Sequence, residues 1–276
     1  MSGARSVDAR LALEQLFGTP NYVMGMVHLL PLPGSPRWAG EMARVLERAV
    51  ADAQALEGSG IDGLIVENFG DAPFCKGRVE AHTVSAMTRA VAAVKDAVGI
   101  PVGINVLRTD SRSALAIAAV TGANFIRVNV HTGVMVTDQG IVEGDAYETV
   151  RYRKQLGADI KILTDVLVKH ATPLGIQSIE QAAKDTAYRG LADALIVTGS
   201  GTGEPTEMED VVRTKEAVPD IPVLVGSGVH EGNVAKLLSL VEGVIVGTSL
   251  KQDGVTTNPV DEKRVARLMA VVRESR

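Results

Sequence analysis

The sequence predicts a TIM (β/α)8 barrel with a short N-terminal helix, and three observations favour this fold. The chain has 276 residues, close to the roughly 250 that are typical of this barrel. Short β-branched runs alternate about eight times with stretches of helical period, as in a parallel sheet whose strands are each followed by a helix. Strand-to-helix connections such as Phe69–Glu80 are longer than helix-to-strand connections such as Gly122–Asn124. The long loops therefore gather at one end of the barrel, where such proteins hold their active sites.

The predicted strands and helices follow one another along the whole chain. The strands are Tyr22–His28, Gly63–Glu67, Val102–Leu107, Phe125–His131, Ile160–Asp165, Ala194–Thr198, Val223–Gly226 and Gly243–Gly247. The helices are Glu41–Glu57, Thr83–Val98, Ser111–Thr121, Tyr147–Leu156, Ile179–Tyr188, Met208–Ala217, Gly232–Leu240 and Pro259–Glu274. An acidic residue precedes three of the strands, at Asp62, Asp193 and Glu242, and proline opens two others, at Pro101 and Pro222. Both features mark strand entries, because proline's missing N–H costs least at the start of a strand.

The domain organisation and the location of the protein can be predicted from its linkers, its N-terminus, its cysteine content and its apolar runs. No linker or shift in composition divides residues 1–276, so we predict a single domain, with residues 1–20 as a helical extension over the barrel floor. The N-terminal residues interleave charged and apolar side chains and lack a signal-peptide core. The lone Cys75 cannot form an intrachain disulfide. No apolar run approaches the roughly 20 residues of a membrane span. These features favour a cytoplasmic protein.

Composition argues against a nucleic-acid partner. The formal net charge is −5, and the basic residues are scattered among acidic ones rather than clustered. Aromatic residues make up only 3% of the chain, too few for the stacking surfaces of a single-strand binder. A small molecule is the expected ligand, and a homo-oligomer is the expected assembly.

Glycine-rich turns follow the last three predicted strands and favour phosphate binding. Glycine lets backbone N–H groups approach an anion, serine and threonine add hydroxyl donors, and a helix N-terminus adds a positive dipole end. In many TIM barrels the loops after strands seven and eight form such a site. Any one of these turns could instead be only a tight turn. The predicted phosphate-binding residues are Gly199, Ser200, Gly201, Gly226, Ser227, Gly228, Gly247, Thr248 and Ser249.

Polar residues alternate with apolar ones in the predicted strands, which points the polar set into the barrel. Arg127 alternates with Ile126 and Val128, so the two kinds of side chain lie on opposite faces. The predicted catalytic residues are Glu67, Asn105, Arg127, Asn129, His131, Lys161 and Asp165. Buried structural ion pairs are the alternative interpretation. Chemistry is favoured, because burying several ionisable groups in a barrel is costly.

Roles for these residues follow from their chemistry. Lys161 could form a Schiff base or act as an electrophile, and Glu67 or Asp165 could serve as a general base beside a carbonyl. Lys169, His170 and Asp138 are further candidates, for which a solvated loop is the alternative. We predict no cofactor. A divalent metal remains the alternative, and its ligands would be His28, His131, Glu67 and Asp165, although no usual metal-binding spacing supports it.

Four motifs resemble those of the BtpA/SgcQ family, and the similarity runs from about Tyr22 to the C-terminal helix. They are Met26–Pro36, Val66–Phe74, Arg127–Gly133 and Val197–Gly203. The resemblance implies a TIM barrel. It also implies a connection to photosystem I biogenesis, as for cyanobacterial members, or to sugar-phosphate metabolism, as for SgcQ-like members. It supplies no catalytic residues.

Three functions remain open at this point. The first is an enzyme that acts on a phosphorylated small metabolite such as a sugar phosphate, by isomerase, epimerase or lyase chemistry. The second is a non-catalytic photosystem I biogenesis or stability factor, although no long exposed apolar stripe is evident. The third is a hydrolase of a nucleotide or glycosidic bond, although no Walker-type motif supports a P-loop mechanism.

Overall fold

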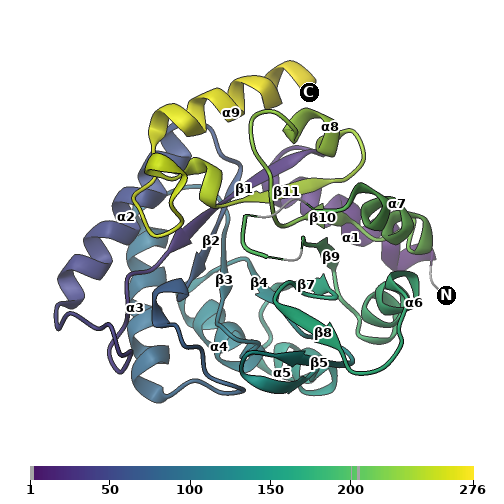
Figure 1. Ribbon diagram of the computed structural model, residues 1–276, viewed down its shortest axis with the longest axis horizontal. Helices are drawn as coiled ribbons and strands as arrows, with labels where there is room; N and C mark the ends of the chain where they lie inside the picture. The colour runs from purple at the N-terminus through teal and green to yellow at the C-terminus, as the bar shows by residue number, and fades with distance from the viewer. Residues whose placement is uncertain (1–2, 200, 204–205) are drawn as a thin grey trace.

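The computed structural model describes residues 3–199, 201–203 and 206–276, and it confirms the predicted TIM barrel (Figure 1). Eight parallel strands close in the order β1-β11-β10-β9-β7-β4-β3-β2. They span β1 (Tyr22–His28), β2 (Gly63–Glu67), β3 (Val102–Asn105), β4 (Phe125–Val128), β7 (Lys161–Val166), β9 (Ala194–Val197), β10 (Val223–Val225) and β11 (Gly243–Val246). Strand β1 closes the ring by pairing with both β2 and β11.

Helices surround the strands, close to their predicted positions (Figure 1). They are α1 (Gly3–Phe17), α2 (Met42–Gly58), α3 (Ala81–Ala97), α4 (Ser111–Thr121), α5 (Ala146–Leu156), α6 (Ile179–Lys184), α7 (Met208–Ala217), α8 (Val234–Leu238) and α9 (Glu262–Ser275). Side chains of Asp110, Asp145 and Asp261 accept hydrogen bonds from the first-turn N–H groups of α4, α5 and α9, which fixes where these helices begin. Across the described part of the chain, no helix combines the length and apolarity needed to span a membrane.

The acids that precede strands brace the barrel floor. The carboxylate of Asp62 accepts the N–H of Val23 at 2.7 Å, that of Asp193 accepts the N–H of Ile162 at 2.7 Å, and that of Glu242 accepts the N–H of Val223 at 2.9 Å. Each acid thus accepts the N–H of the first or second residue of the strand next to its own. The repeated motif seen in the sequence is therefore a strand-to-strand tie.

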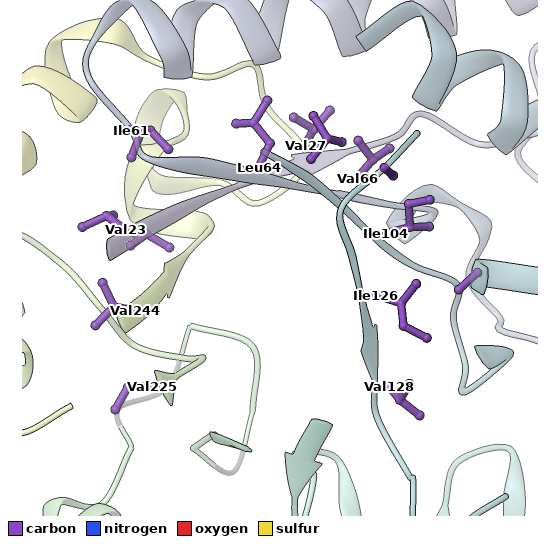
Figure 2. Close-up of a cluster of buried hydrophobic side chains, with 14 of the residues drawn as sticks. Val23, Val27, Ile61, Leu64, Val66, Ile104, Ile126, Val128, Val225 and Val244 are labelled. Atoms are coloured by element: carbon purple, nitrogen blue, oxygen red, sulfur yellow. The ribbon is translucent and has the colours of Figure 1, made fainter. Parts of the chain in front are cut away.

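Two apolar layers hold the barrel together. The outer layer packs the strands against the helices, and Figure 2 shows Val27, Leu64 and Val66 between them. The inner layer fills the lower lumen with side chains that include Tyr22 and Phe125. Each of these rings lies opposite a strand glycine, Gly243 and Gly103 respectively, where a Cβ would lie 2.4 Å and 2.1 Å from the ring.

The N-terminal helix closes the floor of the barrel, as the sequence predicts. Leu13 and Phe17 of α1 are buried in the inner layer, and the Phe17 ring stacks on Tyr22 with centroids 4.2 Å apart. Because apolar side chains fill this end, polar side chains inside the barrel can gather only near the C-terminal ends of the strands.

A small antiparallel sheet, absent from the sequence prediction, lies outside the barrel. It consists of β5 (Val134–Thr137), β6 (Gly140–Glu143) and β8 (Ala171–Pro173), in the order β6-β5-β8. Strand β4 ends at Val128 rather than at His131, because the chain leaves the barrel there to build this sheet. Val130, Met135, Val142 and Val168 form its own small core.

A buried ion pair ties the loop after β11 to helix α2. The Lys251 ammonium lies 3.1 Å from Asp52, and neither side chain is more than 3% exposed. The other Asp52 oxygen accepts the N–H of Val260 at 2.8 Å, and Arg48 also contacts this carboxylate at 3.1 Å. The pair therefore holds both ends of the loop that follows Thr248 and Ser249.

We expect Lys251→Met to lower the free energy of unfolding by about 1 to 3 kcal/mol, the usual cost of losing a hydrogen bond to a charged group. Arg48 still neutralises Asp52 in this variant, which limits the loss. Urea denaturation measures the change. Lys263→Met, on the exposed face of α9, is the matched control; an equal loss in both variants would show that the buried pair adds nothing.

Candidate functional site

Two adjoining cavities open at the C-terminal ends of the strands and together form one bowl. The narrower has a volume of about 180 Å³ and is lined by the loops after β9, β10 and β11. The wider has a volume of about 470 Å³ and is lined by the loops after β2, β3, β4 and β7. Both are lined by Glu67, Phe69, Arg127, Lys169 and Thr202. A ligand with two chemically different parts could therefore occupy both at once.

Arg127, Asn129 and Asp165 form a buried network at the bottom of the bowl. The Arg127 guanidinium donates to both carboxylate oxygens of Asp165, with contacts of 2.9 and 3.2 Å from Nη2. Asn129 Nδ2 donates to Asp165 at 2.6 Å. Burial alone would lower the pKa of Arg127, but Asp165 and then Glu67 raise it above its ordinary value. Arg127 is therefore a permanent cation, and Asp165 is its ion-pair partner.

Glu67 is a buried residue on the wall that the two cavities share. Asn105 Nδ2 donates to Glu67 Oε2 at 2.6 Å. Burial raises the pKa of Glu67, and the nearby Arg127 and Lys169 oppose that rise only in part. A buried carboxyl that opens into a cavity, with a pKa above its ordinary value, is suited to act as a general acid or base.

His28 is a neutral side chain in the narrower cavity. Burial, and next the charge of Lys251, lower its pKa well below the ordinary value for histidine. Its Nδ1 lies 3.3 Å from the Thr256 carbonyl, which can only accept, so we assign the proton to Nδ1. Nε2 is then left with its lone pair, 3.8 Å from Glu67 Oε1. The ring also contacts Phe69, with centroids 4.7 Å apart.

Lys169 supplies the amine of the bowl, from the loop after β7. It lines both cavities and is partly buried. Burial, and next the charge of Arg127, lower its pKa to about 8. The sequence offers a signal for it, since it follows the inward-pointing Asp165 by four residues, but a solvated loop was an equally good interpretation.

Two of the predicted catalytic residues lie outside the bowl. Lys161 is the first residue of β7, so it shares a face with Asp165 but lies at the opposite end of the strand, where its ammonium pairs with Asp159 at 2.6 Å. His131 follows the end of β4, and its Nε2 lies 2.8 Å from the carbonyl of Gly190, which follows the helical turn Asp185–Arg189 after α6. The predicted position of both side chains in the bowl is therefore wrong. Alternation gives the face of a strand but not the depth along it.

The remaining predicted catalytic residues are brought together. Glu67, Arg127 and Asn129 line a cavity directly, and Asp165 and Asn105 support them from below. The sequence prediction missed Arg108, which follows β3 and is buried. Its guanidinium donates to the backbone carbonyl of Lys169 at 3.1 Å and contacts Asp138 at 3.3 Å. An arginine directly after a predicted strand was the signal that could have found it.

Six of the predicted phosphate-binding residues line the narrower cavity. They are Gly226, Ser227, Gly228, Gly247, Thr248 and Ser249, joined by Gly203 and Thr202. Gly199 and Gly201 do not line it, and Ser200 lies outside the described residues. At Gly226 a Cβ would lie 2.6 Å from Ile196, and at Gly228 the backbone has a φ of 66°, so both positions need glycine.

Two of the hydroxyl groups around this cavity already donate to backbone carbonyls. Ser227 Oγ donates to the carbonyl of Gly201 at 2.9 Å, and Ser249 Oγ donates to the carbonyl of Val229 at 2.7 Å. Thr248 Oγ1 lies 2.9 Å from Thr256 Oγ1, and either can be the donor. These hydroxyls brace the loops. Anion binding here would therefore depend on backbone N–H groups and on Thr248.

The alternative metal-binding set is not assembled. His131 lies behind the end of β4, away from His28 and Glu67, and Asp165 is held by Arg127. Within residues 3–199, 201–203 and 206–276, no group of three or more histidine, cysteine, aspartate or glutamate side chains could hold a metal ion.

Fold and site together define a TIM-barrel protein with a polar bowl at the C-terminal ends of its strands. The chain belongs to the BtpA family, whose model matches residues 19–274. It is 52% identical to the photosystem I biogenesis protein BtpA of Synechocystis, over 95% of this chain and 91% of that protein. It is 34% identical to the putative sgc region protein SgcQ of Escherichia coli, over 96% of this chain and 98% of that protein.

Solved structures confirm the fold. Phosphoribosyl anthranilate isomerase from Thermus thermophilus superposes with a TM-score of 0.58 at 12% sequence identity, covering 92% of this chain and 100% of that one. The native KDPGal structure superposes with a TM-score of 0.57 at 15% identity, covering 92% and 95%. At this level of identity the likeness concerns the fold alone.

Proposed function

We propose that this protein is an enzyme that acts on a phosphorylated small metabolite, such as a sugar phosphate, by isomerase, epimerase or lyase chemistry. One observation carries the proposal. A buried carboxyl with a raised pKa, Glu67, opens into the same bowl as the glycine loops after β10 and β11. An acid–base group beside an anion cradle suits a substrate with a phosphate at one end and a reactive carbon at the other.

The narrower cavity would take the phosphate. Gly228, Gly247 and Thr248 bring backbone to its wall, and the position corresponds to the phosphate site of many TIM barrels. The neutral His28 adds no charge there, but Lys169 and Arg127 lie on the shared wall and provide a positive field. The cradle is therefore complementary to an anion.

The wider cavity would take the rest of the metabolite. Glu67 would move a proton at a carbon or hydroxyl of the substrate. Asn129 Oδ1 is buried and has no hydrogen-bond partner in the described part of the chain, although its Nδ2 donates to Asp165. The two cavities would thus have separate tasks: the narrower would bind the phosphate, and the wider would hold the reacting part of the metabolite.

A non-catalytic role in photosystem I biogenesis is the competing function, because a relative at 52% identity carries that name. A binding surface for other proteins would leave the buried Glu67, Arg127 and Asp165 without a task, and their burial is costly. Hydrolysis of a nucleotide or glycosidic bond is a third possibility, which the same phosphate cradle would serve. Ligand screening separates these functions.

We expect phosphorylated metabolites to raise the melting temperature of the wild type, and Thr248→Glu to abolish the effect. A ligand at 100 times its Kd stabilises the native state by about 2.7 kcal/mol. A glutamate at position 248 would place a negative charge in the cradle and repel phosphate. Thermal unfolding against inorganic phosphate, sugar phosphates and nucleotides measures both effects.

Ser85→Glu is the matched control, because it adds the same charge on the exposed face of α3. It should respond like the wild type. If no phosphorylated compound stabilises the wild type, the proposal fails and the biogenesis role is favoured. Stabilisation by nucleotides alone would favour the hydrolase.

A further inference from the structure

The backbone of Lys169 is held from two sides. Its N–H donates to Thr198 Oγ1 at 3.1 Å, and its carbonyl accepts from Arg108 Nη2 at 3.1 Å. Leu167 and His170, on either side of it, have φ values of 50° and 56°, which are uncommon for side chains other than glycine. Such conformations persist only where surrounding contacts impose them. The loop is therefore built to hold Lys169 in one position.

The ammonium group of Lys169 differs in its surroundings from those of the lysines that form ion pairs. Lys161, Lys215 and Lys251 each pair with a carboxylate. Lys169 lines both cavities. Within residues 3–199, 201–203 and 206–276, no carboxylate lies close enough to its ammonium group, at 4.0 Å or less, to form an ion pair. Its side chain thus faces the bowl rather than a structural partner.

The charge beside Lys169 favours the free amine. Burial and the neighbouring Arg127 lower its pKa to about 8, while Asp165 keeps Arg127 charged. About a tenth of Lys169 side chains would be unprotonated at pH 7, against fewer than about one in a thousand for an ordinary lysine. Desolvation and an adjacent cation are the usual means of activating a nucleophilic lysine.

We propose that Lys169 forms a Schiff base with the substrate, and that the substrate is therefore a phosphorylated aldehyde or ketone. The inference rests on the proposed function and names its substrate class. It transfers to Lys169 the role that the sequence alone gave to Lys161. It stands on the position of Lys169 on the wall that the two cavities share, which Glu67 also lines.

The covalent step balances without any further reactant. The Nζ lone pair attacks the carbonyl carbon, a C–N bond forms, and the carbonyl oxygen takes up a proton to give a carbinolamine. The nitrogen loses a proton, the hydroxyl leaves as water after protonation, and an imine remains. Protonated Glu67 lies on the same wall and can supply the proton to the leaving hydroxyl. The resulting carboxylate can then take a proton from the carbon next to the protonated imine, which gives an enamine. Return of a proton to carbon restores the protonated imine, and water hydrolyses it to the carbonyl product and the free lysine.

Borohydride trapping tests the proposal directly. The protein is incubated with glyceraldehyde 3-phosphate, dihydroxyacetone phosphate or ribose 5-phosphate, reduced, and examined by intact mass and peptide mapping. We expect one adduct, on Lys169, that excess inorganic phosphate suppresses. The rate of its formation should rise with pH to a midpoint near the lysine pKa of about 8. Ribose without phosphate is the matched probe and should label poorly.

Three variants serve as controls. Lys169→Gln should lose the adduct, and Lys161→Gln, at the other end of β7, should keep it. Lys169→Arg keeps the positive charge but cannot form an imine. It should still be stabilised by the sugar phosphate in thermal unfolding, yet give no adduct.

The outcomes separate this inference from the proposed function. If phosphorylated carbonyl compounds stabilise the wild type but none labels Lys169, the Schiff base is refuted and the proposed function stands. Equal labelling of wild type and Lys169→Gln refutes it as well. Selective labelling of Lys169 by ribose and ribose 5-phosphate alike, without stabilisation by any phosphate, supports the lysine and refutes the phosphate site. Neither stabilisation nor labelling refutes both.

Discussion

Replacing Asp165 with alanine is expected to lower the free energy of unfolding by about 3 to 5 kcal/mol, the typical cost of breaking a buried ion pair. The Arg127 and Asp165 side chains are 3% and 0% exposed. Without Asp165, the guanidinium stays buried, no other carboxylate of the described residues forms an ion pair with it, and Asn129 Nδ2 loses its acceptor as well. Arg127 cannot relieve the cost by losing its proton, since arginine remains charged in proteins.

Urea denaturation measures this loss, and the chain offers a matched control. Asp159 pairs with Lys161 at the barrel surface, and its side chain is 86% exposed. Asp159→Ala should therefore cost less than about 1 kcal/mol. The double variant Arg127→Met/Asp165→Leu should recover much of the stability, because apolar side chains of similar volume often replace a buried pair. Similar losses in the two single variants would contradict the importance of the network.

Replacing Glu67 with glutamine is expected to lower turnover by about 100-fold to 10,000-fold, the usual contribution of a general acid or base. The same change should raise the melting temperature. Burial raises the pKa of Glu67, so the surroundings in the native state disfavour its charged form, and ionising it there costs stability. Glutamine removes that cost and retains an oxygen that can accept from Asn105.

The sign of the pH dependence follows from the raised pKa. A group whose pKa is higher in the folded state contributes stability below its unfolded pKa, about 4.3 for glutamate, and loses it as the pH rises through the folded value. The gain from Glu67→Gln should therefore be larger at pH 8 than at pH 5. For a protein near this size, each kcal/mol shifts the melting temperature by about 2 to 4 °C.

Thermal unfolding at both pH values and turnover of the metabolite found by ligand screening test this prediction. Glu47→Gln, on the exposed face of α2, is the control and should change neither property appreciably. A lower melting temperature for Glu67→Gln would show that Glu67 is a structural ion-pair partner. Unchanged turnover would remove it from the chemistry.

The barrel was predictable because its information is local and repeated. Strand β2 spans Gly63–Glu67, the bounds that the sequence predicts, and the acid before it, Asp62, marks its entry. The β5–β6–β8 sheet was not predictable in this way, since β8 lies more than thirty residues after β5 and pairs only through the fold.

The candidate site was predictable in part. Side-chain alternation put Arg127 and Asp165 inside the barrel, and the structure joins them at 2.9 Å. The same alternation misplaced Lys161, because it specifies a face and not a depth, and Lys161 begins the strand in which Asp165 comes near the end. His131 failed for another reason, since β4 ends three residues before it.

The sequence by itself determined the class of fold, the end of the barrel that carries the long loops, and the residues that can enter the lumen, because hydrophobic period and turn chemistry act between neighbours in the chain. Only the tertiary structure decided which charged groups meet. Lys169 belongs to the bowl because Arg108 and Thr198, distant in sequence, hold its backbone there. Burial beside Arg127 then sets its pKa. Desolvation and the proximity of other charges depend on the tertiary surroundings of a side chain, so they cannot be predicted from the order of the residues alone.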